Sequence, residues 1–219
     1  MVCKCKILDF PCETNYESSH KQLQKWFRFI SLVLNSFLFL FLVIYLRGEF
    51  FLYISYWAVF LTFIYFLGVS LSYQTQCLRP ICYMLFEGVY PINWFTTILW
   101  WGLTDFKASS LGLGIVSHHF PLITMTIDFI LSKIEFQRTH YIFPFTIVGI
   151  WVSLVLLPAT FKYRVLYRGI NFRNLFTYLM FLALVGIIII SFEVARVIRV
   201  KSCKSRRPRH DSCEIKEMN

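Results

Sequence analysis

The chain has 219 residues, of which 57% are hydrophobic and 19% are aromatic, and its mean hydropathy is +0.59. A soluble domain of this length cannot bury so much apolar surface, so the composition excludes a soluble globular protein and indicates an integral membrane protein. The net charge of +10, from 22 basic and 12 acidic residues, is concentrated in the two tails and the short loops, as expected for groups kept out of hydrocarbon.

Long apolar runs predict six transmembrane helices, since a helix of about 20 residues spans a bilayer. No short apolar segment with a small-residue cleavage site precedes the first run, so we expect that run to act as an uncleaved signal. The third run is the least apolar, because Pro91 and Asn93 open it and Asp105 closes it. The expected spans cover residues 26–46, 50–73, 90–104, 111–132, 141–161 and 175–198.

The segment 74–88 contains Arg79, Pro80 and Glu87 and is too polar to span, so we expect it to lie in the membrane interface. The sequence shows no internal repeat and no soluble domain. We therefore predict an all-α polytopic membrane protein. Its parts are a cytosolic N-terminal tail over 1–25, a six-helix transmembrane domain over 26–199 and a basic cytosolic C-terminal tail over 200–219.

Basic residues in both tails predict that both termini are cytosolic, in the endoplasmic reticulum or the plasma membrane. One loop disagrees, because its four basic residues would then lie on the opposite side. Either the tails override this loop or one span is miscounted, and we favour the first. The basic residues are Lys4, Lys6, Lys21, Lys25 and Arg28 near the N-terminus, Lys162, Arg164, Arg168 and Arg173 in the loop, and Arg196, Arg199, Lys201, Lys204, Arg206, Arg207, Arg209 and Lys216 near the C-terminus.

Five of the seven cysteines lie in the tails, where a reducing cytosol disfavours structural disulfides. The chain has no CxxC pattern and no His/Cys cluster with zinc spacing, so we predict no structural metal and no cofactor. We expect no nucleic-acid partner. The basic C-terminal run can attract anionic lipid headgroups, although a plain stop-transfer anchor is the simpler interpretation.

Two hydroxyl side chains in the second span are candidate nucleophiles. Ser55 and Thr62 are seven residues apart, so they share one helical face at a separation of about 10 Å. A serine or threonine in a membrane helix usually bonds to its own backbone or to a neighbouring helix. A catalytic interpretation therefore needs a partner.

The fourth span supplies that partner in His118, which is followed by His119 and Asp128. His118 and Asp128 are about 15 Å apart along a straight helix, so Asp128 must pair with another group. A lone histidine here is more often a packing residue, but a His pair with an acid favours function, because imidazole accepts a proton near neutral pH. Ser55 and His118 are expected at the same depth, where the hydroxyl can become a nucleophile for acyl transfer.

Three short patterns in the chain form a recognisable set. They are Gly48 with Tyr53-Ile54-Ser55, Trp57 and Tyr65-Phe66; Pro91 with Phe95 and Trp101; and His118 with Asp128. Together, from about Gly48 to Tyr167, they resemble the androgen-induced gene family of integral membrane hydrolases, which cleave fatty acid esters of hydroxy fatty acids. The resemblance implies six spans and a threonine nucleophile paired with a histidine. Ser55 stands at the threonine position and His118 at the histidine, with Thr62 as the alternative counterpart.

The leading hypothesis is a lipid ester hydrolase without a cofactor. Ser55 or Thr62 attacks an acyl ester delivered from the bilayer, His118 acts as base and then as acid, and Asp128 is a supporting acid. The alternative is a non-enzymatic membrane subunit or scaffold in which Ser55, His118 and Asp128 form a polar clamp between helices. A transporter is a weaker hypothesis, because the chain has no duplicated halves.

Overall fold

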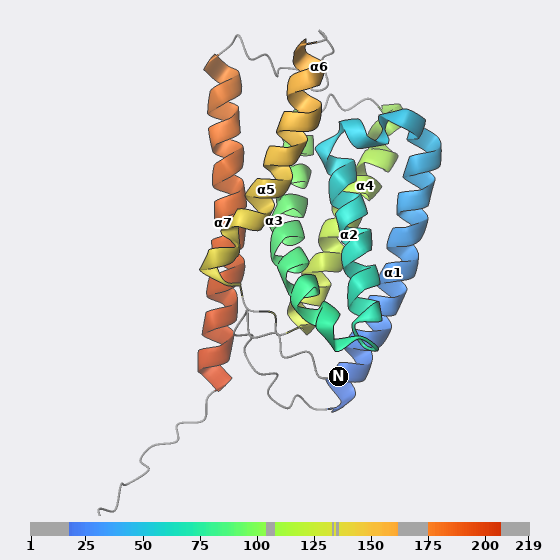
Figure 1. Cartoon of the computed structure of the whole chain (residues 1–219), viewed down its shortest axis with the longest axis vertical. Coiled ribbons are helices and arrows are strands. Elements are labelled where there is room, and N and C mark those ends of the chain that lie inside the picture. Colours follow the sequence, from blue (N-terminus) through green and yellow to red (C-terminus); the bar gives the residue numbers. More distant parts are fainter. Residues whose placement is uncertain (1–17, 104–107, 133, 135, 162–174, 207–219) are drawn as a thin grey trace, which may run out of the picture.

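The structure is a computed structural model that describes residues 18–103, 108–132, 134, 136–161 and 175–206, and every regular element in these ranges is helical (Figure 1). This confirms the predicted all-α class. The elements are α1 (Ser18–Leu46), η1 (Arg47–Leu52), α2 (Ile54–Leu71), η2 (Gln76–Leu78), α3 (Arg79–Leu103), α4 (Ala108–Leu131), η3 (Arg138–Tyr141), α5 (Ile142–Trp151), η4 (Val152–Leu156, a π-helix), α6 (Leu157–Phe161) and α7 (Leu175–Arg206).

Five helical stretches in the described residues are long and apolar enough to cross a membrane. They are Lys21–Leu46, Ile54–Leu71, Gly112–Leu131, Arg138–Ala159 and Thr177–Arg199. The chain is therefore a multi-pass membrane protein in architecture. The long helix outside this set is α3, which is also the least apolar of the six predicted spans.

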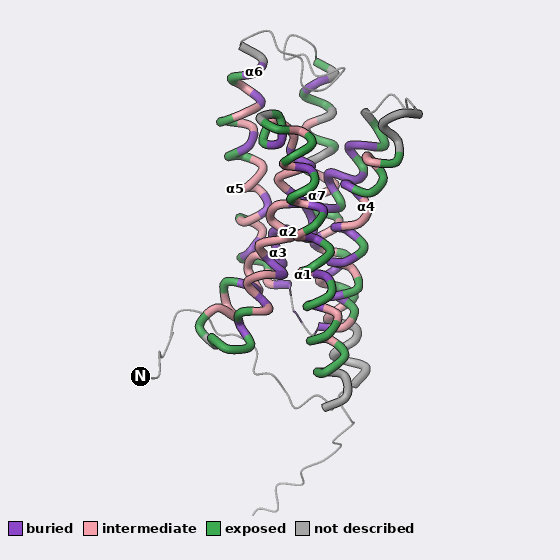
Figure 2. The backbone as a smooth tube through the Cα atoms, turned by 90° about the vertical axis from the view of Figure 1, so that its right-hand side faces the viewer, coloured by how far each residue is buried: buried purple, intermediate pink, exposed green. Residues whose placement is uncertain are grey.

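The helix α3 lies at the centre of the bundle and packs against α2, α4, α5 and α7 (Figure 1). All residues from 86 to 100 except Trp94 and Ile98 are buried. Figure 2 shows the same pattern, with buried positions on the inner sides of the helices and exposed positions on their outer sides. Because protein rather than lipid surrounds α3, this helix can carry polar side chains such as Glu87 and Asn93.

The structure differs from the sequence-based expectation over 74–88. Arg79 begins α3, so most of this polar segment forms the first turns of the central helix. The polar groups are tolerated there because partners inside the protein bind them, and Glu87 is only 1% exposed. The outer helices are also longer than expected, since α1 begins at Ser18 and α7 continues to Arg206. Residues 1–17, the basic loop 162–174 and residues 207–219 lie outside the described residues.

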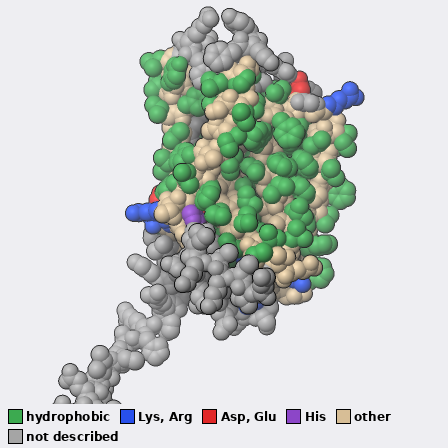
Figure 3. Space-filling view, viewed as in Figure 1, with side chains coloured by type: hydrophobic (Ala, Val, Ile, Leu, Met, Phe, Trp, Pro, Cys, Tyr) green, Lys and Arg blue, Asp and Glu red, His purple; other side chains and the backbone are tan. Residues whose placement is uncertain are grey.

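The outer faces of α1 and α7 carry large exposed apolar side chains. Phe37 and Ile44 on α1 are 69% and 74% exposed, and Leu182 and Ile190 on α7 are 68% and 63% exposed. Figure 3 shows hydrophobic side chains over most of one face, with the few visible charged groups toward its upper and lower ends. A surface of this kind is stable against lipid and not against water.

The direction of each helix fixes which residues share a level. The first residue of α1 and the last of α7 lie at the same end of the bundle, which we call the terminal end (Figure 1). The helices α2 and α4 both start at the opposite end and run toward the terminal end, whereas α3 runs back from it. Residues of α2 and α4 therefore advance in the same direction.

Candidate functional site

His118 is a buried histidine with an unused ring nitrogen. It lies on α4 facing α3, is 7% exposed, and its imidazole stacks on the Trp100 indole with ring centroids 5.2 Å apart at 21°. Thr97 on α3 donates a hydrogen bond to the backbone carbonyl of His118 at 2.9 Å. The Nδ1 atom of His118 is buried and has no hydrogen-bond partner among the described residues. Such groups are uncommon in native structures, so this nitrogen requires an explanation.

The Trp100 indole reaches His118 because Gly114, one turn earlier on α4, has no side chain. A Cβ atom at Gly114 would lie 2.5 Å from Trp100 Cζ2 and 2.9 Å from Cε2, closer than any real contact of this kind. The glycine therefore leaves a notch that the indole fills. This fit places the flat face of Trp100 against the imidazole of His118.

His119 differs from His118 because its ring is fully paired. Trp101 donates its indole N–H to His119 Nε2 at 3.0 Å, so Nε2 is the acceptor nitrogen. The other nitrogen, Nδ1, then carries the proton and donates to the carbonyl of Ile115 at 3.1 Å. Trp101 is half exposed, which places this pair on the lipid side of Trp100. We call Trp100, Trp101, Gly114, His118 and His119 the His118 cluster.

Ser55 is the second residue of α2 and is buried. Because His118 Nδ1 has no partner among the described residues, the Ser55 hydroxyl does not hydrogen-bond to it. The two residues nevertheless lie at similar levels. The Tyr65 hydroxyl donates to Asp128, and Ser55 precedes Tyr65 by ten residues just as His118 precedes Asp128 by ten. Since α2 and α4 run in the same direction with equal rise, the two predicted site residues lie within about one or two helical turns of the same height.

A hydrogen bond between α2 and α3 gives the relative levels of Ser55 and Trp100. Asn93 on α3 donates its amide to the Thr62 hydroxyl at 3.0 Å. The helices α2 and α3 are antiparallel, so seven residues back along α2 and seven forward along α3 bring Ser55 to about the level of Trp100. The indole that stacks on His118 therefore comes from α3 at about the level of Ser55.

Thr62, the alternative nucleophile, is fully buried and accepts the Asn93 amide described above. The same amide also donates to the carbonyl of Val89 at 3.1 Å, which fixes its orientation. Thr62 thus links α2 to α3 in the middle of the bundle. The structure brings it to an amide rather than to a histidine.

Asp128, the predicted supporting acid, pairs with Arg28 rather than with His118. Arg28 Nε lies 2.8 Å from Asp128 Oδ1 and Nη2 lies 3.3 Å from Oδ2, while the Tyr65 hydroxyl donates to the same carboxylate. Arg28 also donates to the Tyr73 hydroxyl at 3.4 Å. We call Arg28, Tyr65, Tyr73 and Asp128 the Arg28 cluster. It joins α1, α2 and α4 near the terminal end, about 15 Å along α4 from His118.

Two charged side chains that are paired inside the bundle were not predicted from the sequence. Arg28 was counted with the basic residues near the N-terminus, but it lies inside α1 and is 9% exposed. Glu87 was expected in the interface, but it accepts the Gln137 backbone N–H at 2.8 Å and pairs with the ring of His140. The signal in both cases was a charged residue beside an apolar run. Such a residue needs a partner, and the sequence alone does not identify it.

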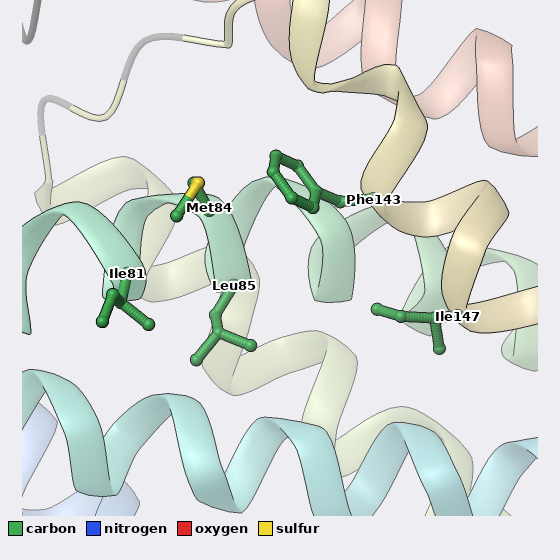
Figure 4. Close-up of a pocket in the computed structure, with 5 residues that line it drawn as sticks. All are labelled: Ile81, Met84, Leu85, Phe143 and Ile147. Atoms are coloured by element: carbon green, nitrogen blue, oxygen red, sulfur yellow. The ribbon is translucent and has the colours of Figure 1, made fainter. Parts of the chain in front are cut away.

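An apolar groove lies between α3 and α5 (Figure 4). Its volume is about 200 Å³, and the lining residues are Ile81, Met84, Leu85, Phe143 and Ile147. None of the predicted site residues lines it. The groove suits a hydrocarbon chain, but these five side chains supply no group for acid–base or nucleophilic chemistry.

The described residues contain no group of three or more His, Cys, Asp or Glu side chains that could hold a metal ion. Comparisons of the chain with protein-family models, with curated proteins and with solved structures give no match. The resemblance drawn from the sequence motifs therefore stays a prediction.

Proposed function

We propose that this chain is a membrane-embedded lipid ester hydrolase that uses the Ser55 hydroxyl as nucleophile and His118 as base. The proposed substrates are fatty acyl esters of hydroxy fatty acids. The observation that carries the proposal is the free Nδ1 atom of His118, a buried proton acceptor in an apolar bundle. Ser55 supports it, because it is buried at a similar level on a neighbouring helix.

The chemistry follows the usual order for acyl transfer. The neutral imidazole of His118 takes the Ser55 proton as the serine oxygen attacks the ester carbonyl, and the proton then passes to the departing alcohol. Water attacks the resulting acyl-serine ester with His118 again as base, which releases the fatty acid and restores the hydroxyl. The substrate must draw Ser55 and His118 together, as catalytic contacts are often longer before substrate binds.

The proposed topology has six spans, namely the five apolar stretches and α3, and it places both termini in the cytosol. It is supported by the start of α1 and the end of α7, which lie at one end of the bundle (Figure 1), and by the basic tails. The proposed location is the endoplasmic reticulum or the plasma membrane, with anionic lipid at the C-terminal tail. A glycosylation-acceptor tag after Asn219 should remain unmodified, and modification of the tag would overturn this orientation.

The decisive experiment measures ester hydrolysis and thermal stability on the same purified variants. Loss of His118 in His118→Ala should reduce turnover by a factor of about 10² to 10⁴, while the melting temperature in detergent changes little. The control is His119→Ala, which removes the neighbouring imidazole but leaves His118 in place, and it should retain most activity. Unchanged turnover in His118→Ala would reject the hydrolase.

The nucleophile is tested separately with a fluorophosphonate probe, which reacts with an activated hydroxyl. The wild-type protein should be labelled, and Ser55→Ala should lose the label. Labelling that persists in Ser55→Ala and disappears in Thr62→Ala would move the nucleophile to Thr62. Labelling that persists in both variants would remove both residues from the reaction.

A second candidate function is a non-enzymatic membrane subunit or scaffold. The Arg28 cluster favours it, because this cluster joins three helices by polar contacts and leaves Asp128 engaged. Under this alternative, no ester turnover is detected in the wild type, and His118→Ala lowers the melting temperature without a change in any activity. The paired measurement described above separates the two functions.

A further inference from the structure

We infer that Trp100 controls access of the lipid ester to His118, with its indole seated in the Gly114 notch when the site is closed. This inference rests on the proposed function, because it names the access route to the same site. Trp100 takes no part in the reaction under this inference, and its movement decides whether the ester can reach His118. Three features of the structure support it: the cover over His118, the level of Ser55 and the outer layer of the cluster.

The first feature is the cover. The indole of Trp100 lies flat on the His118 ring, and only 8% of Trp100 is exposed. The notch at Gly114 holds the indole in this place, since a Cβ there would touch the ring at 2.5 Å. One face of the imidazole is therefore partly covered by an aromatic ring, and rotation about the Trp100 side-chain bonds would uncover it.

The second feature is the level of the predicted nucleophile. Trp100 lies on α3 at about the level of Ser55, and its ring stacks on His118. An ester carbonyl that contacts both the Ser55 hydroxyl and His118 must reach the imidazole at this level. The imidazole face that Trp100 covers opens to the ester only when the indole moves.

The His118 cluster also has an outer layer. Trp101 packs against Trp100 with ring centroids 5.0 Å apart and is 51% exposed. It is tied to His119 by the 3.0 Å hydrogen bond between their rings. The cluster thus has an outer pair, Trp101 with His119, and an inner pair, Trp100 with His118. Loss of the outer indole should leave His118 covered, and loss of the inner indole should uncover it.

The test measures how fast diethyl pyrocarbonate modifies each histidine in the purified full-length protein, followed by mass spectrometry of peptides. The reagent transfers its ethoxycarbonyl group to a neutral imidazole nitrogen and releases carbon dioxide and ethanol. His118 should react slowly in the wild type and about tenfold faster in Trp100→Ala. Trp101→Ala is the matched control, and it should accelerate His119 while changing His118 by less than about twofold.

Two further variants keep the test valid if Trp100→Ala does not fold. Gly114→Ala fills the notch and should displace the indole, so His118 should react faster. Trp100→Phe keeps an aromatic ring of smaller size and should give an intermediate rate. Equal His118 rates in the wild type and in folded Gly114→Ala or Trp100→Ala would overturn the inference, as would equal acceleration of His118 by Trp101→Ala.

Failure of this inference is distinguishable from failure of the hydrolase. Suppose that the wild type hydrolyses the ester and that His118 is modified at the same rate in the wild type and in Trp100→Ala. This result would reject the access role of Trp100 and keep the enzyme. Faster labelling of His118 in Trp100→Ala with no ester turnover in the wild type would keep the cover over His118 and reject the enzyme. Turnover with faster labelling supports both.

Discussion

The Arg28 cluster and the His118 cluster place ionisable side chains at two levels of the same bundle, but they differ in how those side chains are paired. Asp128 receives two contacts from Arg28 and a hydrogen bond from Tyr65, so its carboxylate is occupied from both sides. His118 has an aromatic ring on one face and an Nδ1 atom without a partner among the described residues. The first arrangement is complete, and the second leaves one polar atom without a partner.

This difference separates stability from function. A buried ion pair in an apolar bundle is costly to break, because removal of one partner leaves the other charged and unsatisfied. The His118 imidazole stacks on Trp100, and its Nδ1 atom costs free energy while it remains without a partner. Mutations in the Arg28 cluster should therefore act on folding, and mutations at His118 should act on chemistry.

The largest effect on stability is expected for Asp128→Ala. This variant leaves Arg28 buried without its carboxylate, so it should destabilise the protein by about 3 to 5 kcal/mol. The measurement is unfolding in detergent by heat or by sodium dodecyl sulfate. The matched control is Arg28→Met with Asp128→Leu, which removes both charges and should recover most of the loss. A single variant as stable as the wild type would mean that the pair does not hold α1 to α4.

Gly114→Ala should have an intermediate effect on stability. The new methyl group meets the Trp100 indole at 2.5 Å, and overpacking of this kind costs about 1 to 3 kcal/mol. Gly112 on the same helix has no atom within 4 Å of an added Cβ, so Gly112→Ala is the matched control. It should be neutral or stabilising, because alanine favours helix more than glycine does. Equal melting temperatures for the two variants would contradict the fit of Trp100 into the notch.

Much of the helical arrangement could be predicted from the sequence, because lipid-facing helices must be apolar along a whole span. The runs that became α1, α2, α4 and α7 were located in this way, and counting residues from the start of the second and fourth spans predicted a similar depth for Ser55 and His118. The start of α3 was not predicted, because protein buries most of this helix and polar residues such as Glu87 are satisfied there. A hydropathy argument assumes lipid neighbours on most of a helix, and α3 exposes only a few of its apolar side chains.

The pairings themselves could not be predicted. Arg28 and Asp128 are separated by 100 residues, and Glu87 and His140 by 53, so no local spacing connects them. The sequence did indicate that Asp128 is too far from His118 along the helix and needs another partner. It did not indicate that Trp100 would lie against His118, because that contact depends on the notch at Gly114.

The smallest effect is expected for Thr62→Val, which keeps the shape of the side chain and removes the oxygen that accepts the Asn93 amide. Hydrogen bonds between membrane helices contribute about 0.6 kcal/mol on average, so the loss of stability should be near this value. The control is Thr126→Val, since the Thr126 hydroxyl bonds within its own helix to the Leu122 carbonyl at 2.7 Å and should matter less between helices.

The Thr62→Val variant also tests the identity of the nucleophile. If Ser55 is the nucleophile, Thr62→Val should keep fluorophosphonate labelling and ester turnover. If Thr62 is the nucleophile, both should be lost although the protein stays folded, and the Asn93 contact would then belong to the reacting site rather than to the packing of α2 against α3.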